Sequence, residues 1–192
     1  MTAEHEIDPE TSLPIEVPVD DTPADAPVAE FIAGRYARLE PLAMRHASDL
    51  FAASSDAGAA ARFRYLLDSQ PASVVGNILL GPTIARTRVA TEAIYLMARQ
   101  CIDGWRYRRF EWKCDNLNAA SCRAANRFGF VFEGVFRRDF IVKGRSRDTA
   151  WYSITDEDWP RVRDGFERWL DPPNSDEEDR QKLSLEAMRG DP

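Results

Sequence analysis

The sequence contains few of the residues that bind metals or build disulfide frameworks. Its 192 residues include two histidines and three cysteines, and the cysteines show neither CxxC spacing nor a nearby histidine. This excludes a zinc site and a disulfide scaffold and suits a reducing compartment. No apolar stretch reaches the roughly 18 residues of a membrane span, and no signal-peptide pattern opens the chain. We expect a cytoplasmic protein without bound metal or membrane contact.

A glycine-rich nucleotide fingerprint of the Walker or Rossmann type is also missing. Charge is unevenly distributed along the chain. Residues 1–33 carry nine acidic and no basic side chains, whereas residues 171–192 carry seven acidic and three basic ones. With −9 and −4 at the two ends, the overall −7 leaves +6 for residues 34–170. A basic body between acidic ends favours an anionic ligand such as a nucleotide or coenzyme.

Composition divides the chain into three parts. Residues 1–33 are rich in proline and acidic side chains and poor in aromatics, which predicts a disordered acidic tail. Residues 34–170 have the apolar content of one folded domain. Residues 171–192 open with two prolines and continue as a charge run, which predicts a linker and an acidic C-terminal tail with one frayed helix.

Within residues 34–170, hydrophobic periodicity predicts alternating strands and helices. The expected strands are 34–42, 74–80, 110–115, 130–142 and 148–154, and the expected helices are 43–53, 62–67, 89–103, 119–128 and 159–170. Several helix-end signals support these bounds: Gly104 and Gly129 as C′ glycines, Asn118 as an N-cap, and Thr155 with Asp158 as a capping box. The order predicts an α/β (α+β) fold, with a mixed sheet flanked by helices.

The loop that leads into the predicted helix 89–103 is the segment most typical of a ligand site. A helix N-terminus offers free amides and a positive dipole to a phosphate. Arg86 and Arg88 add positive charge beside it, and arginine can contact phosphate oxygens in bidentate fashion. The alternative is an ordinary capping loop with two solvated arginines.

Two blocks of the sequence resemble the GNAT superfamily of acetyl-CoA-dependent N-acetyltransferases, and in particular the branch of bacterial ribosomal-protein N-terminal acetyltransferases. Ala90-Thr91-Glu92-Ala93 matches the end of the family's pyrophosphate loop, although Ala85 and Arg88 replace its leading glutamine and first glycine. The second block, from Asn118-x-x-Ser121 to Gly129-Phe130, matches the family's following helix. With Glu133-Gly134 and the hairpin to Trp151, the resemblance covers roughly residues 78–160.

The resemblance implies roles for individual residues. The backbone amides of Arg88, Val89, Ala90 and Thr91 would hold the pyrophosphate of acetyl-CoA, with Arg86 assisting. Asn118 would bind the pantetheine or order the site. Ser121 occupies the place of the general acid proposed for the ribosomal-protein branch, whereas Ala125 stands where many members have a tyrosine acid. Glu133 and Asp139 are candidate bases. The alternatives are a plain helix cap for Asn118 and an ordinary first-turn residue for Ser121.

The sequence departs from the family between the first predicted helix and strand 74–80. Members usually carry a second helix and two long antiparallel strands there, but this chain has only about twenty residues, from Ser54 to Ser73. We therefore expect a domain shortened in its N-terminal half, without the central strand hairpin. Strand 74–80 would then present a bare edge, which favours a homodimer.

Three functions are compatible with these features. The first is acetyl transfer from acetyl-CoA to a primary amine, either a protein N-terminal α-amine or a small amine. The second is a non-catalytic acyl-CoA-binding module or an inactive shortened variant, suggested by Ala125 and the short interval. The third is nucleic-acid binding, suggested by the arginines in and around the predicted strands 110–115, 130–142 and 148–154. It is disfavoured because the alternation of side chains along a strand would spread these arginines over both faces of the sheet, and the acidic ends of the chain would compete with phosphates.

Overall fold

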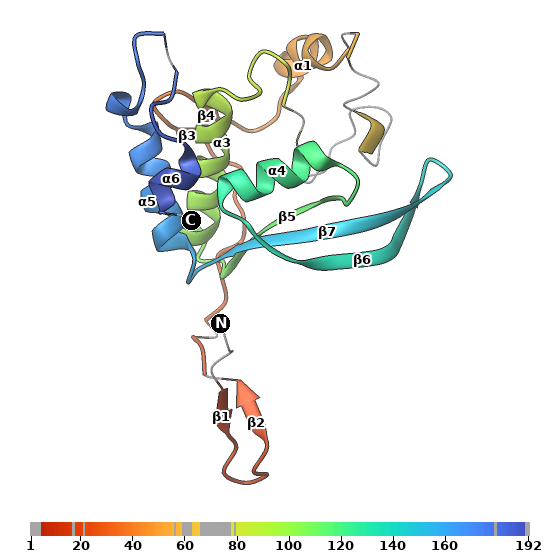
Figure 1. Ribbon diagram of the computed structural model, residues 1–192, viewed down its shortest axis with the longest axis vertical. Coiled ribbons are helices and arrows are strands. Elements are labelled where there is room, and N and C mark those ends of the chain that lie inside the picture. Colours follow the sequence, from red (N-terminus) through yellow and green to blue (C-terminus); the bar gives the residue numbers. More distant parts are fainter. Residues whose placement is uncertain are drawn as a thin grey trace.

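The computed structural model describes residues 5–16, 18–20, 22–55, 57–58, 63–65, 78, 80–178 and 180–190. Helices and strands alternate from the centre of the chain onward (Figure 1). The strands are β1 (His5–Ile7), β2 (Pro14–Glu16), β3 (Ile32–Ala33), β4 (Arg38–Leu39), β5 (Arg109–Asp115), β6 (Val131–Val142) and β7 (Arg145–Thr155). The α-helices are α1 (Ala47–Ser54), α3 (Arg88–Arg99), α4 (Ala119–Phe128), α5 (Trp159–Leu170) and α6 (Leu185–Arg189). Short 3-10 or π turns are η1 (Met44–His46), η2 (Phe63–Tyr65), η3 (Gln100–Gly104) and η4 (Pro172–Asn174).

A three-stranded sheet organises the centre of the fold. Its strand order is β5-β7-β6, and both neighbouring pairs are antiparallel. The long β6–β7 hairpin extends away from the helices, and α4 crosses one side of the sheet (Figure 1). The predicted α/β architecture is confirmed. Most of the expected strand 74–80 lies outside the described residues, of which only Ile78 and Leu80 fall in it. Half of the expected helix 62–67 is described, and its residues Phe63–Tyr65 form the 3-10 turn η2. Most of the interval from Ser54 to Ser73 also lies outside the described residues.

Aromatic rings from three helices and the sheet fill the core. The Tyr95 ring of α3 lies 5.6 Å from the Phe166 ring of α5, and Phe166 stacks at 6.2 Å on Phe128 of α4. Phe128 in turn lies 6.0 Å from Trp112 on β5. Because Phe166 is fully buried at the centre of this chain of rings, it connects α3, α4 and α5.

The predicted signals at both ends of α4 and at the start of α5 are confirmed. The Oδ1 atom of Asn118 accepts from the Ser121 amide at 3.1 Å, and Gly129 is left-handed with φ of 92°. At α5, the Thr155 amide donates to the Asp158 carboxylate at 3.1 Å, and the Asp158 amide donates back to the Thr155 hydroxyl at 3.3 Å. These reciprocal bonds satisfy amides that a helix start leaves without partners.

Gly104 does not end α3 as a C′ glycine, so that prediction is wrong. The helix widens into the π turn η3, in which the Trp105 amide donates to the Gln100 carbonyl at 2.8 Å. A Cβ at residue 104 would lie 2.6 Å from the Gln100 side-chain amide nitrogen. Gly104 thus lies beside the Gln100 side chain and does not adopt the left-handed conformation of a C′ glycine.

The single strand predicted for residues 34–42 is replaced by a small β3–β4 hairpin around a turn at residues 34–37. The cause is Glu92, a buried carboxylate on α3 that is only 5% exposed. Its oxygens accept from the amides of Arg35, Tyr36 and Ala37 at distances of 2.5 to 2.8 Å. Three converging amides bend the chain around the carboxylate, and a Cβ at Gly34 would lie 2.5 Å from it.

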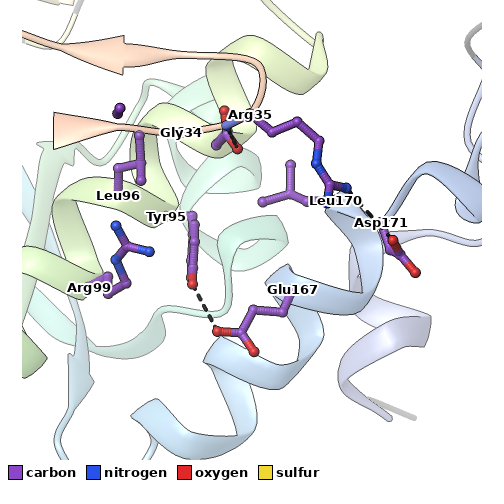
Figure 2. Close-up of a pocket in the computed structure, with 10 residues that line it drawn as sticks. Gly34, Arg35, Tyr95, Leu96, Arg99, Glu167, Leu170 and Asp171 are labelled. Atoms are coloured by element: carbon purple, nitrogen blue, oxygen red, sulfur yellow. Dashed lines mark hydrogen bonds and ion pairs between the residues drawn. The ribbon is translucent and has the colours of Figure 1, made fainter.

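A hollow of about 360 Å³ lies beside this turn, between α3 and α5 (Figure 2). Two contacts cross it. The Tyr95 hydroxyl donates to Glu167 at 2.9 Å, and the Arg35 guanidinium lies 3.7 Å from the Asp171 carboxylate. The turn at residues 34–37 is thus fastened to both helices.

The predicted tail at residues 171–192 packs against the domain, contrary to the expectation of a linker and a frayed helix. Leu185 is fully buried and Met188 nearly so, and both belong to the core that includes α5. The Arg189 guanidinium donates to the carbonyls of Arg127 at 2.6 Å and Asn126 at 3.2 Å, at the end of α4. Helix α6 thereby supplies a donor to the last carbonyls of α4, where a helix end lacks intrahelical amides.

The predicted disordered tail at residues 1–33 also differs from expectation. Strands β1 and β2 pair as an antiparallel hairpin, which stands apart from the rest of the molecule in Figure 1. Farther along, the Asp25 amide donates to the Trp105 carbonyl at 3.0 Å, and Glu30 accepts from Gln100 at 2.6 Å. Residues 25–30 therefore lie along the surface of η3.

Replacing Glu92 by glutamine should destabilise the fold, because an NH₂ group would face amide donors. We expect Glu92→Gln to lower the free energy of unfolding by about 1–3 kcal/mol, the usual cost of a buried unsatisfied polar group. Urea unfolding followed by circular dichroism measures the change. The matched control Glu177→Gln, at an exposed position, should change stability little. Equal stabilities of the two variants would contradict the anchoring role of Glu92.

The packing of α6 makes a second stability prediction. Leu185→Ala should cost about 2–5 kcal/mol, because it opens a cavity at a fully buried site. Leu183→Ala, two residues earlier but 53% exposed, is the control and should cost far less. A Leu185 variant as stable as the Leu183 variant in urea would show that α6 is a frayed tail after all.

Candidate functional site

The loop before α3 consists of tight turns that are closed by hydrogen bonds within the loop. The Gly81 carbonyl accepts from the amides of Ile84 at 3.1 Å and Ala85 at 2.9 Å. The Ile84 carbonyl accepts from both the amide and the hydroxyl of Thr87, at 3.2 and 2.6 Å. Arg86 lies between these turns with φ of +68°, in the left-handed region, and its side chain is exposed. The loop thus holds one arginine in solvent beside the start of the helix.

Thr87 caps α3 and uses two of the amides that the sequence assigns to phosphate binding. Its hydroxyl accepts from the Ala90 amide at 3.3 Å, and its carbonyl accepts from the Thr91 amide at 3.2 Å. The side chains of Ala90 and Thr91 are buried, whereas Val89 is 38% exposed. Helical geometry leaves the amides of the first two residues, Arg88 and Val89, without an intrahelical acceptor.

The Arg88 side chain packs inward, which differs from the expectation that both loop arginines face a ligand. Its guanidinium lies 4.3 Å from the centre of the Tyr36 ring, and its Nη1 atom donates to the Tyr36 hydroxyl at 3.0 Å. The same hydroxyl donates to the Leu170 carbonyl at 3.1 Å. Arg88 therefore joins the turn at residues 34–37 to the start of α3 and the end of α5.

A half-buried arginine connects the two helices that carry the motif. The Nη1 atom of Arg127, on α4, donates to the Thr91 hydroxyl in the first turn of α3 at 3.2 Å. The guanidinium also stacks on Trp169 at 5.0 Å, and burial lowers its pKa. The structure thus brings the end of α4 to the start of α3, although 36 positions separate the bonded residues.

The start of α4 is ordered by a turn that follows β5. The Asn118 amide donates to the Asp115 carbonyl at 2.8 Å, and the Asp115 carboxylate accepts from the Leu117 amide at 2.9 Å. Asn118 is thereby placed to cap the helix, as predicted. The Ser121 hydroxyl accepts from the Trp112 indole at 3.0 Å, beneath the helix.

Two thiols and a phenol lie next to Ser121. The sulfur atoms of Cys114 and Cys122 are 3.7 Å apart. Burial raises the pKa of Cys114 to about 11, while a hydrogen bond from Ser121 acts in the opposite direction. Burial and a hydrogen bond with Cys122 raise the pKa of the nearby Tyr152 hydroxyl. No metal or catalytic pattern in the sequence includes this pair; only the short turn between strand and helix could have indicated that the two cysteines lie close together.

The other candidate acids and bases have different environments. Ala125 is fully buried in the core. Glu133 pairs with Arg109 and also accepts from the Ser153 hydroxyl at 2.6 Å; the arginine holds the pKa of Glu133 below its usual value. Glu133 is therefore a weak base in this position. Asp139 lies on β6 within the irregular pairing between Phe136 and Phe140.

Metal and membrane features can be assessed only for the residues that the structure describes. Over these ranges, no three histidine, cysteine or carboxylate side chains come together as a metal site. Over the same ranges, no helix has the length and apolarity to cross a bilayer.

The chain matches no protein-family model and no curated protein. Solved structures do resemble it. A GCN5-related N-acetyltransferase from Brucella melitensis is 35% identical with a TM-score of 0.83, over 89% of this chain and 99% of the other. A probable acetyltransferase of the GNAT family from Chromobacterium violaceum is 28% identical with a TM-score of 0.65, over 77% and 98%.

The similarity to the Brucella protein extends beyond the two motif blocks and includes nearly its whole length. Sequence identity at that level over a shared fold indicates common descent. The chain belongs to the GCN5-related N-acetyltransferase (GNAT) family.

Proposed function

We propose that the protein transfers an acetyl group from acetyl-CoA to a primary amine, either the α-amine of a protein N-terminus or a small amine. The observation that supports this most is the junction of the two motif helices. The Arg127–Thr91 bond places the end of α4 at the start of α3, the helix whose first amides are suited to an anion. Membership of an acetyltransferase family supplies the reaction type.

In this proposal the pyrophosphate of acetyl-CoA lies at the start of α3. The amides of Arg88 and Val89 point out of the first turn, and the exposed Arg86 guanidinium adds positive charge. Ala90 and Thr91 contribute mainly by holding the turn through Thr87, because their amides are bonded to it. Asn118 orders the start of α4 and brings Ser121 to its place.

Ser121 is the proposed acid. The amine nitrogen attacks the acetyl carbonyl carbon, the carbon–sulfur bond breaks, and the departing thiolate takes the Ser121 proton. The proton that the amine loses passes to solvent, from which Ser121 is reprotonated. An indole N–H only donates, so the bond from Trp112 requires Ser121 to accept and leaves the serine proton available to a sulfur. The resemblance to ribosomal-protein acetyltransferases, which suggested this role, stays part of the proposal.

A coenzyme-binding module without turnover is the second candidate. Ala125 favours it, because this fully buried methyl group replaces the tyrosine acid expected in many GNAT enzymes. Thiol release from acetyl-CoA, measured with a panel of peptide and small amines, separates the two. Release that depends on an amine supports the enzyme, whereas binding without release supports the module.

The proposed phosphate site predicts that Arg86→Glu weakens acetyl-CoA binding by about tenfold, because repulsion replaces a charge-assisted contact. Glutamate meets the same left-handed backbone as arginine, so the fold should be unaffected. Titration calorimetry measures the affinity, with Arg145→Glu on the distant hairpin as the control. Affinity equal to that of the control would remove Arg86 from the site. Arg88→Glu is unsuitable here, since it would also break the Tyr36 contact.

The proposed acid predicts that Ser121→Ala lowers kcat by roughly 10²-fold while acetyl-CoA affinity stays near its original value, since a general acid acts in the transition state. Asn118 can still cap α4 because it bonds the backbone amide of residue 121. Ser54→Ala, on α1, serves as the control in the same thiol-release assay. Full turnover by the Ser121 variant would assign the proton to another group.

A further inference from the structure

Cys114 and Cys122 are a pair of neighbouring thiols that the proposed reaction does not use. Their sulfur atoms are 3.7 Å apart, and they come from two different elements, the end of β5 and the first half of α4. Cys114 is 6% exposed, whereas Cys122 is only partly buried. An oxidant therefore reaches Cys122 first.

We propose that Cys114 and Cys122 are an oxidative modification site, which closes a reversible disulfide between β5 and α4 and displaces Ser121. The disulfide itself depends only on the geometry of the two thiols. Its effect on catalysis rests on the proposed function, because it acts through Ser121, the residue next to Cys122.

The two sulfur atoms need to move only a short distance to form the disulfide, and the packing of β5 and α4 determines which element moves. A disulfide has a sulfur–sulfur distance of about 2 Å, so the atoms must approach by less than 2 Å. Cys114 is held in the sheet opposite Ala150 of β7, and its neighbour Asp115 pairs with Thr149. The first turns of α4 follow an exposed turn at residues 116–117 and have no such ladder. We therefore expect α4 to move.

Movement of α4 toward β5 changes the surroundings of Ser121. Its hydroxyl accepts from the Trp112 indole of β5 at 3.0 Å. Disulfide formation shifts the helix that carries the serine relative to this indole. The shift disturbs the position from which Ser121 would donate its proton.

The chemistry balances with a peroxide as oxidant. The Cys122 thiolate attacks one oxygen of hydrogen peroxide, the O–O bond breaks, and a sulfenic acid and water form after one proton transfer. The Cys114 sulfur then attacks the sulfenic sulfur. The S–S bond forms, the S–O bond breaks, and the hydroxide leaves with the Cys114 proton as a second water. Two thiols are oxidised by two electrons, and one peroxide is reduced to two waters.

Cys101 provides an internal control. Cys101 lies on η3, and its sulfur is 3.9 Å from the Arg109 carbonyl oxygen. Burial raises the pKa of the Cys101 thiol. Trypsin separates it from the proposed pair, because Lys113 and Arg123 bound a peptide of residues 114–123 that holds both Cys114 and Cys122. Cys101 falls in the peptide of residues 100–106.

The full chain should be treated with hydrogen peroxide, alkylated, digested and weighed by mass spectrometry. We expect peptide 114–123 to lose two hydrogens and resist alkylation, and to take up two alkyl groups after dithiothreitol. Peptide 100–106 should be alkylated throughout. The proposal is overturned if peptide 114–123 remains doubly alkylated under oxidation, or if its cysteines become linked only to another molecule.

Variants and turnover test the consequence for the site. Cys122→Ala should abolish the two-hydrogen loss, whereas Cys101→Ala should leave it unchanged. In the thiol-release assay, oxidation should lower turnover of the parent and of Cys101→Ala by about tenfold, as expected for displacement of a general acid, and dithiothreitol should restore it. Turnover of Cys122→Ala should resist the same treatment.

The two proposals fail in different ways. If the reduced protein has no turnover, the proposed function fails, and the mass measurement still decides whether the disulfide forms. If the disulfide forms completely and turnover is unchanged, the coupling to Ser121 is refuted.

Discussion

The structure around the candidate coenzyme loop depends on one buried carboxylate. Glu92 accepts three backbone amides from residues 35–37 and thereby fixes an N-terminal turn to the first turns of α3, more than fifty positions away. A buried carboxylate is costly unless such donors surround it. Because Tyr36 is fixed by this turn, its ring can hold the Arg88 guanidinium, and the start of α3 is set between the turn and α5. The helix N-terminus is consequently preorganised before any anion arrives.

This arrangement changes the meaning of the motif that suggested the family. Within Ala90-Thr91-Glu92, every residue is buried. Glu92 holds the N-terminal turn, and Thr91 joins α3 to Arg127 of α4. The block therefore acts as a structural junction, and in the proposed function the contact with a coenzyme would come from the residues just before it. The reason is that the amides of Ala90 and Thr91 are already bonded to Thr87.

Elements defined by local chemistry were predictable from the sequence. Strand β5 follows its period-two pattern, α4 begins and ends at the capping residues expected for it, and α5 begins directly after the expected turn of Thr155 and Asp158. The failures share a different cause, because each depends on a distant partner. Gly34 begins a turn because of Glu92, and the charge run after residue 175 concealed Leu185 and Met188, whose burial requires α5. At the site, the Asn118 cap was local and predictable, whereas the inward packing of Arg88 required Tyr36.

The surroundings of Ser121 bear on how a serine could protonate a thiolate. A free serine hydroxyl is a very weak acid, so a catalytic role needs help from its neighbours. Trp112 gives that help by donating to the oxygen, which stabilises negative charge developing there as the proton leaves. The bond from the indole does not use the serine proton, because an indole N–H can only donate. A coenzyme thiolate would be a strong acceptor for that proton, because it carries a full negative charge. The helix turn that holds Ser121 against the Trp112 indole also carries Cys122, so the proposed disulfide to Cys114 would move the serine away from the donor that supports it.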